Sequence, residues 1–346
     1  MTKENPFTIT FGKQPNTQIT RYEDVDRIVS SFNAEKPVCQ TFLIEGVRGS
    51  GKTVLMTTVA RQFEEKKDWL VINLNSAMGL LSGLALRLEA SCSGTSKIIG
   101  TGINVTAAGF GIGVNAEEKT TDSVGIIDGL FNKIVKDKKR VLITIDEALH
   151  DDNMRVFASQ FQIFVRQDYP VFLIMTGLYE NIYGIQNDPG LTFLLRSPKI
   201  NIGPLSIFQI IKQYKDIFDM NDEDAKKLAR FTKGYAFAFQ ALGVVYWEKR
   251  QNGMEAVLTA YDELLDDFVY KKIWSALSDN ERRIVLSMTD DEIKTGDVCK
   301  ELSMNPGTFS RYRDQLVHKG IIESKRYGYV SLVLPRFNRI VTNYVF

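Results

Sequence analysis

Short, almost continuously apolar runs recur along the first 200 residues, separated by longer stretches whose apolar positions follow a helical spacing. The runs lie at 41–45, 69–74, 140–145 and 171–175, and the helical stretches include 23–32, 54–63, 79–90 and 122–136. Strands that are apolar on both sides are typical of a parallel sheet with helices on both faces. The pattern therefore predicts an α/β domain in which strands and helices alternate along the chain.

A second pattern begins after residue 203. Ser206 precedes apolar residues at helical spacing, and helices are expected from there to about residue 276. The aromatic residues of 231–240 are expected to belong to the core of this helical part. Its position directly after the α/β domain predicts a helical lid.

The last segment has a third pattern. Ser278 and Glu281 have capping-box spacing, 295–302 is a second helix, and Asn305-Pro306 begins a third. Two strands joined by a basic turn follow within 321–333. Three helices and a hairpin predict a winged helix. The expected domains are a core over 1–203, the lid over 204–276 and the winged helix over 277–346.

The segment 98–115 is rich in glycine. Apolar residues alternate with small or polar ones on both sides of Ala107-Ala108-Gly109, which predicts a hairpin with one nearly bare face. The hairpin either packs on the core or contacts a substrate.

One motif follows the first strand. It consists of eight residues between that strand and a helix: Gly46, Val47, Arg48, Gly49, Ser50, Gly51, Lys52 and Thr53. Two glycines that bracket four residues and precede Lys-Thr form the phosphate-binding (Walker A) pattern. We expect loop amides and Lys52 to bind the phosphates of ATP, and the Thr53 hydroxyl to bind Mg²⁺. Residues 19–22 either contact the base or pack against the core.

Two adjacent carboxylates end the strand at 140–145 and form a candidate Walker B pattern. Asp146 is expected to hold Mg²⁺, and Glu147 to activate the attacking water. Thr176, at the end of the next strand, either senses the γ-phosphate or caps the strand. Arg196 is either a finger that completes a neighbouring subunit's site or a surface arginine.

The composition of the chain indicates the class of protein and its cellular compartment. A net charge of +1 gives no global nucleic-acid footprint, and hydrophobic and charged residues make up 44% and 25% of the chain, as in ordinary soluble proteins. Three scattered cysteines favour a reducing compartment. Neither a signal sequence nor an apolar stretch of membrane-spanning length is apparent. These features predict a cytoplasmic protein without a membrane partner.

Local basic residues of the winged helix remain candidates for binding duplex DNA. Arg311 and Arg313 lie in its third helix, and Lys325 and Arg326 lie at the turn of its hairpin. The third helix of such domains enters the major groove, and the wing contacts phosphates. A winged helix that binds a protein is the alternative.

The motifs at 46–53 and 146–147, with Thr176 and Arg196, resemble those of AAA+ ATPases with a C-terminal winged helix. These P-loop ATPases are found among archaea and bacteria and are related to origin-recognition ATPases and to STAND signalling ATPases; this chain looks most like the bacterial branch. The resemblance covers nearly the whole chain. Phe237 stands where origin-type relatives carry a sensor arginine in the lid, which departs from their pattern.

The resemblance implies an enzyme that binds ATP and Mg²⁺, hydrolyses ATP slowly and couples its nucleotide state to a DNA-binding winged helix. A homo-oligomer that depends on nucleotide, or a protein partner, is expected. Two alternatives remain open. One is a nucleotide switch or scaffold whose winged helix binds protein, and the other is a DNA-binding protein with a vestigial ATPase core.

Overall fold

Residues 4–10, 15–76, 79–92 and 116–345 are described by the computed structural model. They divide into two units. One contains Tyr22–Glu45 and Leu55–Ile200, and the other contains Met1–Arg21, Gly46–Val54 and Asn201–Phe346. The hairpin predicted at 98–115 lies outside the described residues. The domain boundaries predicted from the sequence stay a prediction.

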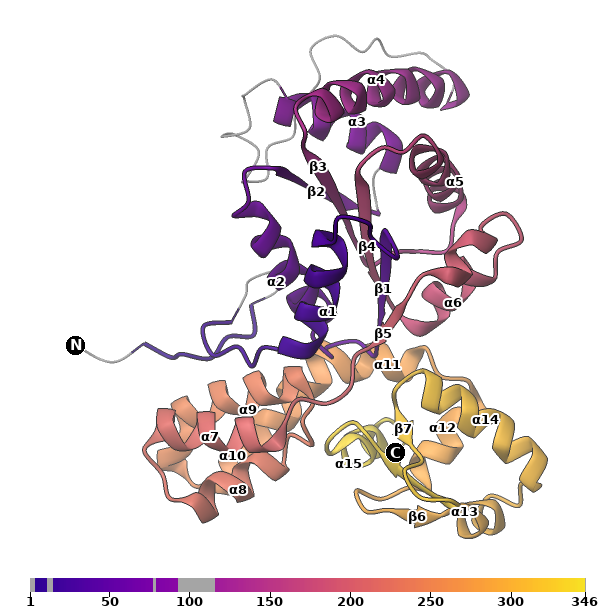
Figure 1. The fold of residues 1–346 in the computed structure, drawn as a ribbon. Helices are drawn as coiled ribbons and strands as arrows, with labels where there is room; N and C mark the ends of the chain where they lie inside the picture. Colours follow the sequence, from indigo (N-terminus) through magenta and orange to yellow (C-terminus); the bar gives the residue numbers. More distant parts are fainter. Residues whose placement is uncertain (1–3, 11–14, 77–78, 93–115, 346) are drawn as a thin grey trace. The chain divides into compact units, whose positions relative to one another are not determined.

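A five-stranded sheet forms the centre of the first unit (Figure 1). Its strands are β1 (Thr41–Glu45), β2 (Trp69–Asn75), β3 (Arg140–Asp146), β4 (Val171–Gly177) and β5 (Lys199–Asn201). Their order is β2-β3-β4-β1-β5. The pairs β2–β3, β3–β4 and β1–β4 are parallel, and Glu45 pairs in register with Gly177. The carboxyl ends of β1, β3 and β4 therefore meet at one edge.

Helices flank this sheet (Figure 1). They are α1 (Tyr22–Asn33), α2 (Lys52–Glu64), α3 (Leu80–Cys92), α4 (Ala116–Lys136), α5 (Asp152–Arg166) and α6 (Tyr179–Asn187). Successive side chains of a strand point to opposite faces. Phe42 and Phe172 accordingly lie 5.4 and 4.9 Å from the ring of Phe32 in α1. The neighbouring Leu43 and Leu173 are fully buried in a core shared with α3, α5 and α6. The predicted α/β fold is confirmed.

The second unit contains the helical lid. Its helices are α7 (Ile207–Phe218), α8 (Asp222–Arg230), α9 (Ala236–Lys249), α10 (Met254–Leu265) and α11 (Lys271–Ser275), with a π-helical turn (η4, Asp266–Tyr270) between the last two. Ser206 caps α7 by accepting from the Gln209 amide. Phe7 is buried among aromatic side chains of the lid and stacks on Phe218 at 5.5 Å. The N-terminal segment thus contributes to the lid core.

The C-terminal part of this unit is a winged helix. It contains α12 (Asp279–Leu286), β6 (Ile293–Lys294), α13 (Thr295–Glu301), α14 (Pro306–His318), β7 (Ile322–Glu323), β8 (Tyr329–Leu332) and α15 (Phe337–Val341). The three strands have the order β6-β8-β7 and pair antiparallel. Ser278 and Glu281 form the predicted capping box, and Asn305 caps α14 through the Thr308 amide.

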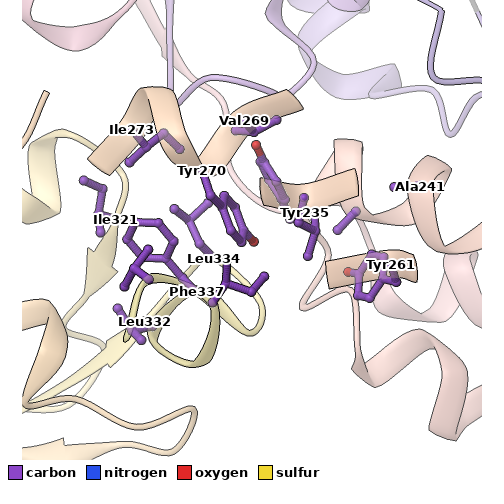
Figure 2. Packing of buried hydrophobic residues seen from close by; sticks show 14 of the residues in the cluster. Tyr235, Ala241, Tyr261, Val269, Tyr270, Ile273, Ile321, Leu332, Leu334 and Phe337 are labelled. Atoms are coloured by element: carbon purple, nitrogen blue, oxygen red, sulfur yellow. The ribbon is translucent and has the colours of Figure 1, made fainter. Parts of the chain in front are cut away.

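Lid and winged helix share one hydrophobic core, seen in Figure 2. Tyr270 packs edge-on against Phe337 at 4.8 Å, and its hydroxyl donates to the Pro335 carbonyl at 2.7 Å. The Arg336 guanidinium forms a two-point ion pair with Asp262 of α10. Lys233 adds hydrogen bonds to the carbonyls of Asp290 and Leu332. These contacts join the two domains by packing and by charge.

Candidate functional site

The predicted phosphate loop forms a tight turn between β1 and α2. Gly49 and Gly51 have φ angles of 76° and 96°, a left-handed backbone that favours glycine. The Ser50 amide donates to the Val47 carbonyl at 3.2 Å and closes the turn. The loop backbone therefore depends on the glycines of the motif.

Lys52 is the first residue of α2. The first amides of a helix have no partner within the helix, and its dipole favours an anion there. The Lys52 ammonium lies at the same place and donates to the carbonyls of Gly46 and Val47 at 3.0 and 3.1 Å. A positive charge, helix-start amides and a glycine backbone are thus combined in one segment, as in anion-binding loops.

Arg21, just before α1, contacts this loop from the N-terminal segment. Its guanidinium donates to the carbonyls of Ser50 at 3.3 Å, Gly203 at 2.7 Å and Pro204 at 3.4 Å. It thereby ties the phosphate loop to the segment that enters the lid. Arg21 belongs to the stretch considered for base contact, but the three bonds described here all go to backbone oxygens.

The start of lid helix α9 also contacts the phosphate loop. The buried Tyr235 hydroxyl donates to the Arg48 carbonyl, and the Phe237 amide donates to the Gly49 carbonyl at 3.0 Å. Ala236 lies against Gly51, since a Cβ built on that glycine would be 3.6 Å from its methyl. The loop thus contacts the N-cap residue and the first two residues of α9.

The candidate carboxylates lie in the other unit, at the carboxyl end of β3. Asp146 is the last residue of the strand and is half-buried. The hydroxyl of the fully buried Thr176 in β4 donates to its Oδ1 atom. The oxygen of the same hydroxyl accepts a hydrogen bond from the Glu147 amide at 3.3 Å. Thr176 therefore orients Asp146 directly; its predicted contact with a γ-phosphate stays a prediction.

Glu147 has an unusual backbone. Its φ of 50° is left-handed, which is uncommon for a residue with a side chain and costs about 1 kcal/mol or more. Its carbonyl accepts from the Ser76 hydroxyl at 3.1 Å, and its side chain is exposed. Such strained residues cluster at functional sites. The strain and the exposure both suit a carboxylate that contacts a reactant.

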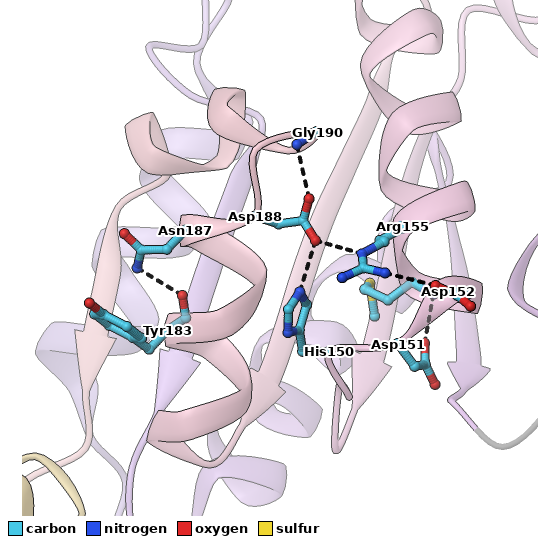
Figure 3. A network of polar contacts seen from close by, with 9 residues as sticks. His150, Asp151, Asp152, Arg155, Tyr183, Asn187, Asp188 and Gly190 are labelled. Carbon is cyan, nitrogen blue, oxygen red and sulfur yellow. Dashed lines mark hydrogen bonds and ion pairs between the residues drawn. The ribbon is translucent and has the colours of Figure 1, made fainter.

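A network of polar contacts centres on the buried carboxylate of Asp188 (Figure 3). Asp188 is 6% exposed; it contacts His150 Nε2 at 2.8 Å and accepts from Arg155 Nε at 2.6 Å and from the Gly190 amide at 2.9 Å. The hydrogen bonds from His150, Arg155 and Gly190 hold the pKa of Asp188 well below its ordinary value. Sequence reasoning missed this network, which links the loop after β3 to the turn after α6.

Arg196 follows that turn. It ends a short 3-10 helix (η2, Thr192–Arg196), and its side chain is exposed. The backbone of this helix is anchored from within: buried Gln186 donates to the Leu194 carbonyl at 3.0 Å, and the Leu191 amide donates to the Asp188 carbonyl at 2.9 Å. Arg196 is thus an exposed cation on a fixed backbone, and its role in a neighbouring site stays a prediction.

The four basic candidates of the winged helix are close to acidic or aromatic side chains. Arg311 is exposed and covers the Tyr312 ring at 4.9 Å, whereas Arg313 pairs with Asp314 at 2.8 Å. Both lie in α14, as predicted.

At the wing, Lys325 pairs with Glu323 at 2.8 Å, and Arg326 is 3.9 Å from Glu292 while it covers Tyr329. Tyr327, between the two strands, is fully exposed. The wing therefore presents cations and an aromatic ring, with carboxylates beside them.

The candidate residues fall into both units. Lys52 and Thr53 belong to the unit with the lid and winged helix, and Asp146, Glu147 and Thr176 belong to the unit with the sheet. The structure brings Thr176, Asp146 and Glu147 together within the sheet unit.

Three solved structures of archaeal proteins have a similar fold. The Aeropyrum pernix ORC2 protein, in ADPNP and ADP complexes, matches with a TM-score of 0.61 at 13% identity over 96% of each chain. Cdc6p from Pyrobaculum aerophilum matches with 0.52 at 16% over 96% of each chain. The Aeropyrum pernix ORC1 protein in complex with DNA matches with 0.50 at 16%, over 95% of this chain and 93% of that one.

The fold is that of the Cdc6 and ORC AAA+ ATPases. The resemblance to origin-recognition ATPases is therefore confirmed for the fold. At this level of identity, the Cdc6/ORC likeness says nothing of residue roles, so the site residues rest on the geometry above.

A domain of unknown function (DUF8462) matches residues 267–341, which include the winged helix. No curated protein matches the chain. Within the described ranges, no helix is both long and apolar enough to cross a membrane.

Proposed function

We propose that this chain binds ATP with Mg²⁺, hydrolyses it slowly and uses the bound nucleotide to set the state of its winged helix. The observation that carries the proposal is the placement of a complete phosphate-loop sequence directly after β1, in a sheet of order β2-β3-β4-β1-β5 whose β3 ends in Asp146 and Glu147. The same fold in a protein solved with ADPNP and ADP supports nucleotide binding.

The binding role falls to the phosphate loop. The loop amides and the Lys52 ammonium are donors that would bind the β- and γ-phosphates. The Thr53 hydroxyl and the Asp146 carboxylate are the oxygens that would hold Mg²⁺. Both donors are oxygens, the ligand type that Mg²⁺ takes, and Mg²⁺ keeps waters and phosphate oxygens beside one or two protein ligands. When bound, the cation neutralises phosphate charge.

The hydrolytic role falls to the sheet edge. Glu147 would orient the attacking water and accept its proton. Thr176 keeps Asp146 in one orientation through the hydrogen bond described above. Arg196 would stabilise charge on the transferred phosphoryl group of a neighbouring subunit, which requires a homo-oligomer.

The winged helix would contact duplex DNA through Arg311 and Arg313 in α14 and through Lys325 and Arg326 in the wing. The exposed Tyr327 and the two wing cations support this role. The acidic partners Asp314, Glu323 and Glu292 favour a second candidate function, in which the winged helix binds a protein and the chain acts as a nucleotide switch.

Steady-state turnover of wild type and of Glu147→Gln tests the catalytic part. The substitution keeps the size of the side chain and removes the carboxylate. We expect normal ATP affinity and at least about tenfold slower turnover, since general-base catalysis contributes about 10²- to 10⁴-fold. Asp151→Asn is the control. It also replaces a carboxylate by an amide, but at a residue with a structural role, since Asp151 caps α5 by accepting from the Met154 amide at 2.8 Å. Equal turnover in wild type and Glu147→Gln would contradict the role of Glu147, and no turnover in wild type would favour a vestigial core.

A further inference from the structure

The lid holds two successive carbonyls of the phosphate loop. The Tyr235 hydroxyl donates to the Arg48 carbonyl, and the Phe237 amide donates to the Gly49 carbonyl at 3.0 Å. Tyr235 is only 4% exposed and packs in the core that Figure 2 shows. The loop, Tyr235 and Phe237 belong to the same unit.

The hydrogen bond to Arg48 constrains more than one atom. A trans peptide is planar, and its carbonyl and its amide hydrogen point in opposite directions. The Arg48 carbonyl and the Gly49 amide belong to one peptide group. Fixing the carbonyl toward Tyr235 therefore fixes the Gly49 N–H toward the other side of the loop. The second bond, from Phe237, fixes the next peptide group in the same way.

We propose that Tyr235 is a positioning residue for nucleotide binding: its hydroxyl, acting through the Arg48 carbonyl, presets the Gly49 amide to donate to a nucleotide phosphate. This rests on the proposed function of the phosphate loop. Tyr235 does not touch the nucleotide in this role. It lowers the cost of binding because the loop peptide is already oriented before phosphate arrives.

The packing around Gly49 supports this role. A Cβ built on Gly49 would lie 2.9 Å from the Tyr235 ring carbon that carries the hydroxyl and 3.1 Å from Phe237 Cβ. Lid and loop thus touch without room for a side chain. Phe237 in turn lies beside Phe268 of the same unit, with ring centroids 6.0 Å apart. The start of α9 therefore acts on the loop backbone. It does not act through a cationic side chain, because residue 237 is a phenylalanine and not the sensor arginine of origin-type relatives.

Tyr235 acts as a donor through a protonated phenol. The ordinary pKa of a tyrosine, about 10, already keeps the proton in place at neutral pH. Desolvation raises the pKa of Tyr235 further, and the nearby Arg48 opposes this only in part.

The lid supplies a matched control for a purely structural role. Tyr261 is fully buried, and its hydroxyl donates to the Phe231 carbonyl at 3.0 Å. The chemistry is the same as at Tyr235, but the accepting carbonyl lies outside the phosphate loop. Tyr261→Phe and Tyr235→Phe each delete one buried hydroxyl and leave one backbone carbonyl without its donor, so both should lower the urea midpoint.

The experiment compares ADP and adenosine binding to wild type and both full-length variants by calorimetry with Mg²⁺ present. We expect Tyr235→Phe to bind ADP roughly three- to tenfold more weakly, the factor that corresponds to one net hydrogen bond. Tyr261→Phe should bind ADP like wild type. Adenosine carries no phosphate, so its affinity should be the same in all three proteins.

The outcomes separate the two proposals. Equal ADP affinity in Tyr235→Phe and wild type, or equal weakening in both variants, overturns the positioning role while nucleotide binding stands. Equal weakening for ADP and adenosine overturns it as well, because the defect then lies outside the phosphates. A wild-type chain that binds no ADP refutes the proposed function itself, and the role of Tyr235 with it.

Discussion

Removing Asp262 should loosen the winged helix from the lid at a cost that the structure allows us to work out. The Arg336 side chain is 11% exposed and that of Asp262 is 21% exposed, and two guanidinium nitrogens contact the carboxylate. An arginine is charged at any ordinary pH, and the hydrogen bonds to Asp262 raise the pKa of the Arg336 guanidinium further. Asp262→Ala would leave that largely buried charge without its main partner.

Breaking a buried ion pair by removing one partner costs about 3–5 kcal/mol. Because this pair retains some contact with solvent, we expect a loss of about 2–4 kcal/mol in the free energy of unfolding. Urea unfolding followed by tryptophan fluorescence measures the loss. Trp274 is a suitable reporter, since it packs 6.4 Å from Phe337 and 5.9 Å from Tyr344.

Asp267→Ala is the matched control. Asp267 pairs with Lys271 at 2.6 Å, but the two side chains are 63% and 56% exposed, so its removal should cost less than about 1 kcal/mol. Asp262→Ala combined with Arg336→Met should recover part of the loss, because the double variant leaves no unpaired buried charge. If Asp262→Ala costs no more than Asp267→Ala, the ion pair does not hold the domains together.

Three further predictions concern the network, the candidate finger and the wing. The depressed pKa of Asp188 contributes stability that is present above its ordinary pKa of about 4 and lost as pH falls below it. The free energy of unfolding should therefore depend less on pH in the acid range in Asp188→Asn than in wild type. The same pH dependence in both proteins would contradict this. Arg196→Ala should lose ATP turnover, and mixing it with Lys52→Ala should restore some, whereas a monomer that still hydrolyses ATP rules out action in trans. Replacing Lys325 and Arg326 by alanine should reduce the salt slope of duplex DNA binding by roughly one per lost phosphate contact, and binding indifferent to the change, or absent at low salt, would assign the winged helix to a protein partner.

The elements that could be predicted from the sequence carry local signals. The apolar runs before Gly46 and Asp146 marked β1 and β3, because buried parallel strands are apolar throughout. Capping residues Ser278 and Asn305 marked the starts of α12 and α14. The aromatic stretch of the lid was expected to be core, which is confirmed for Tyr235 and Phe239.

The features that the sequence did not predict depend on short elements or distant contacts. Strand β6 has two residues, and α15 has five, so neither is long enough to show a periodicity. The Tyr235 hydroxyl bonds to a carbonyl 187 residues earlier in the chain. The contact of His150 with Asp188 joins residues that are 38 positions apart. Only the folded backbone brings such groups together, and one sequence carries no local signal for them.

Calorimetric titration of ATP and ADP into wild type and Lys52→Ala, with Mg²⁺ present, tests the central claim most directly. The ammonium is a charge-assisted donor to phosphate oxygens, and in the structure it donates to two carbonyls of its own loop, those of Gly46 and Val47. We expect wild type to bind both nucleotides, and Lys52→Ala to keep the far-ultraviolet spectrum of the folded chain while losing tight binding of both. A folded Lys52→Ala protein with wild-type affinity for ATP would contradict the assignment of the phosphate loop.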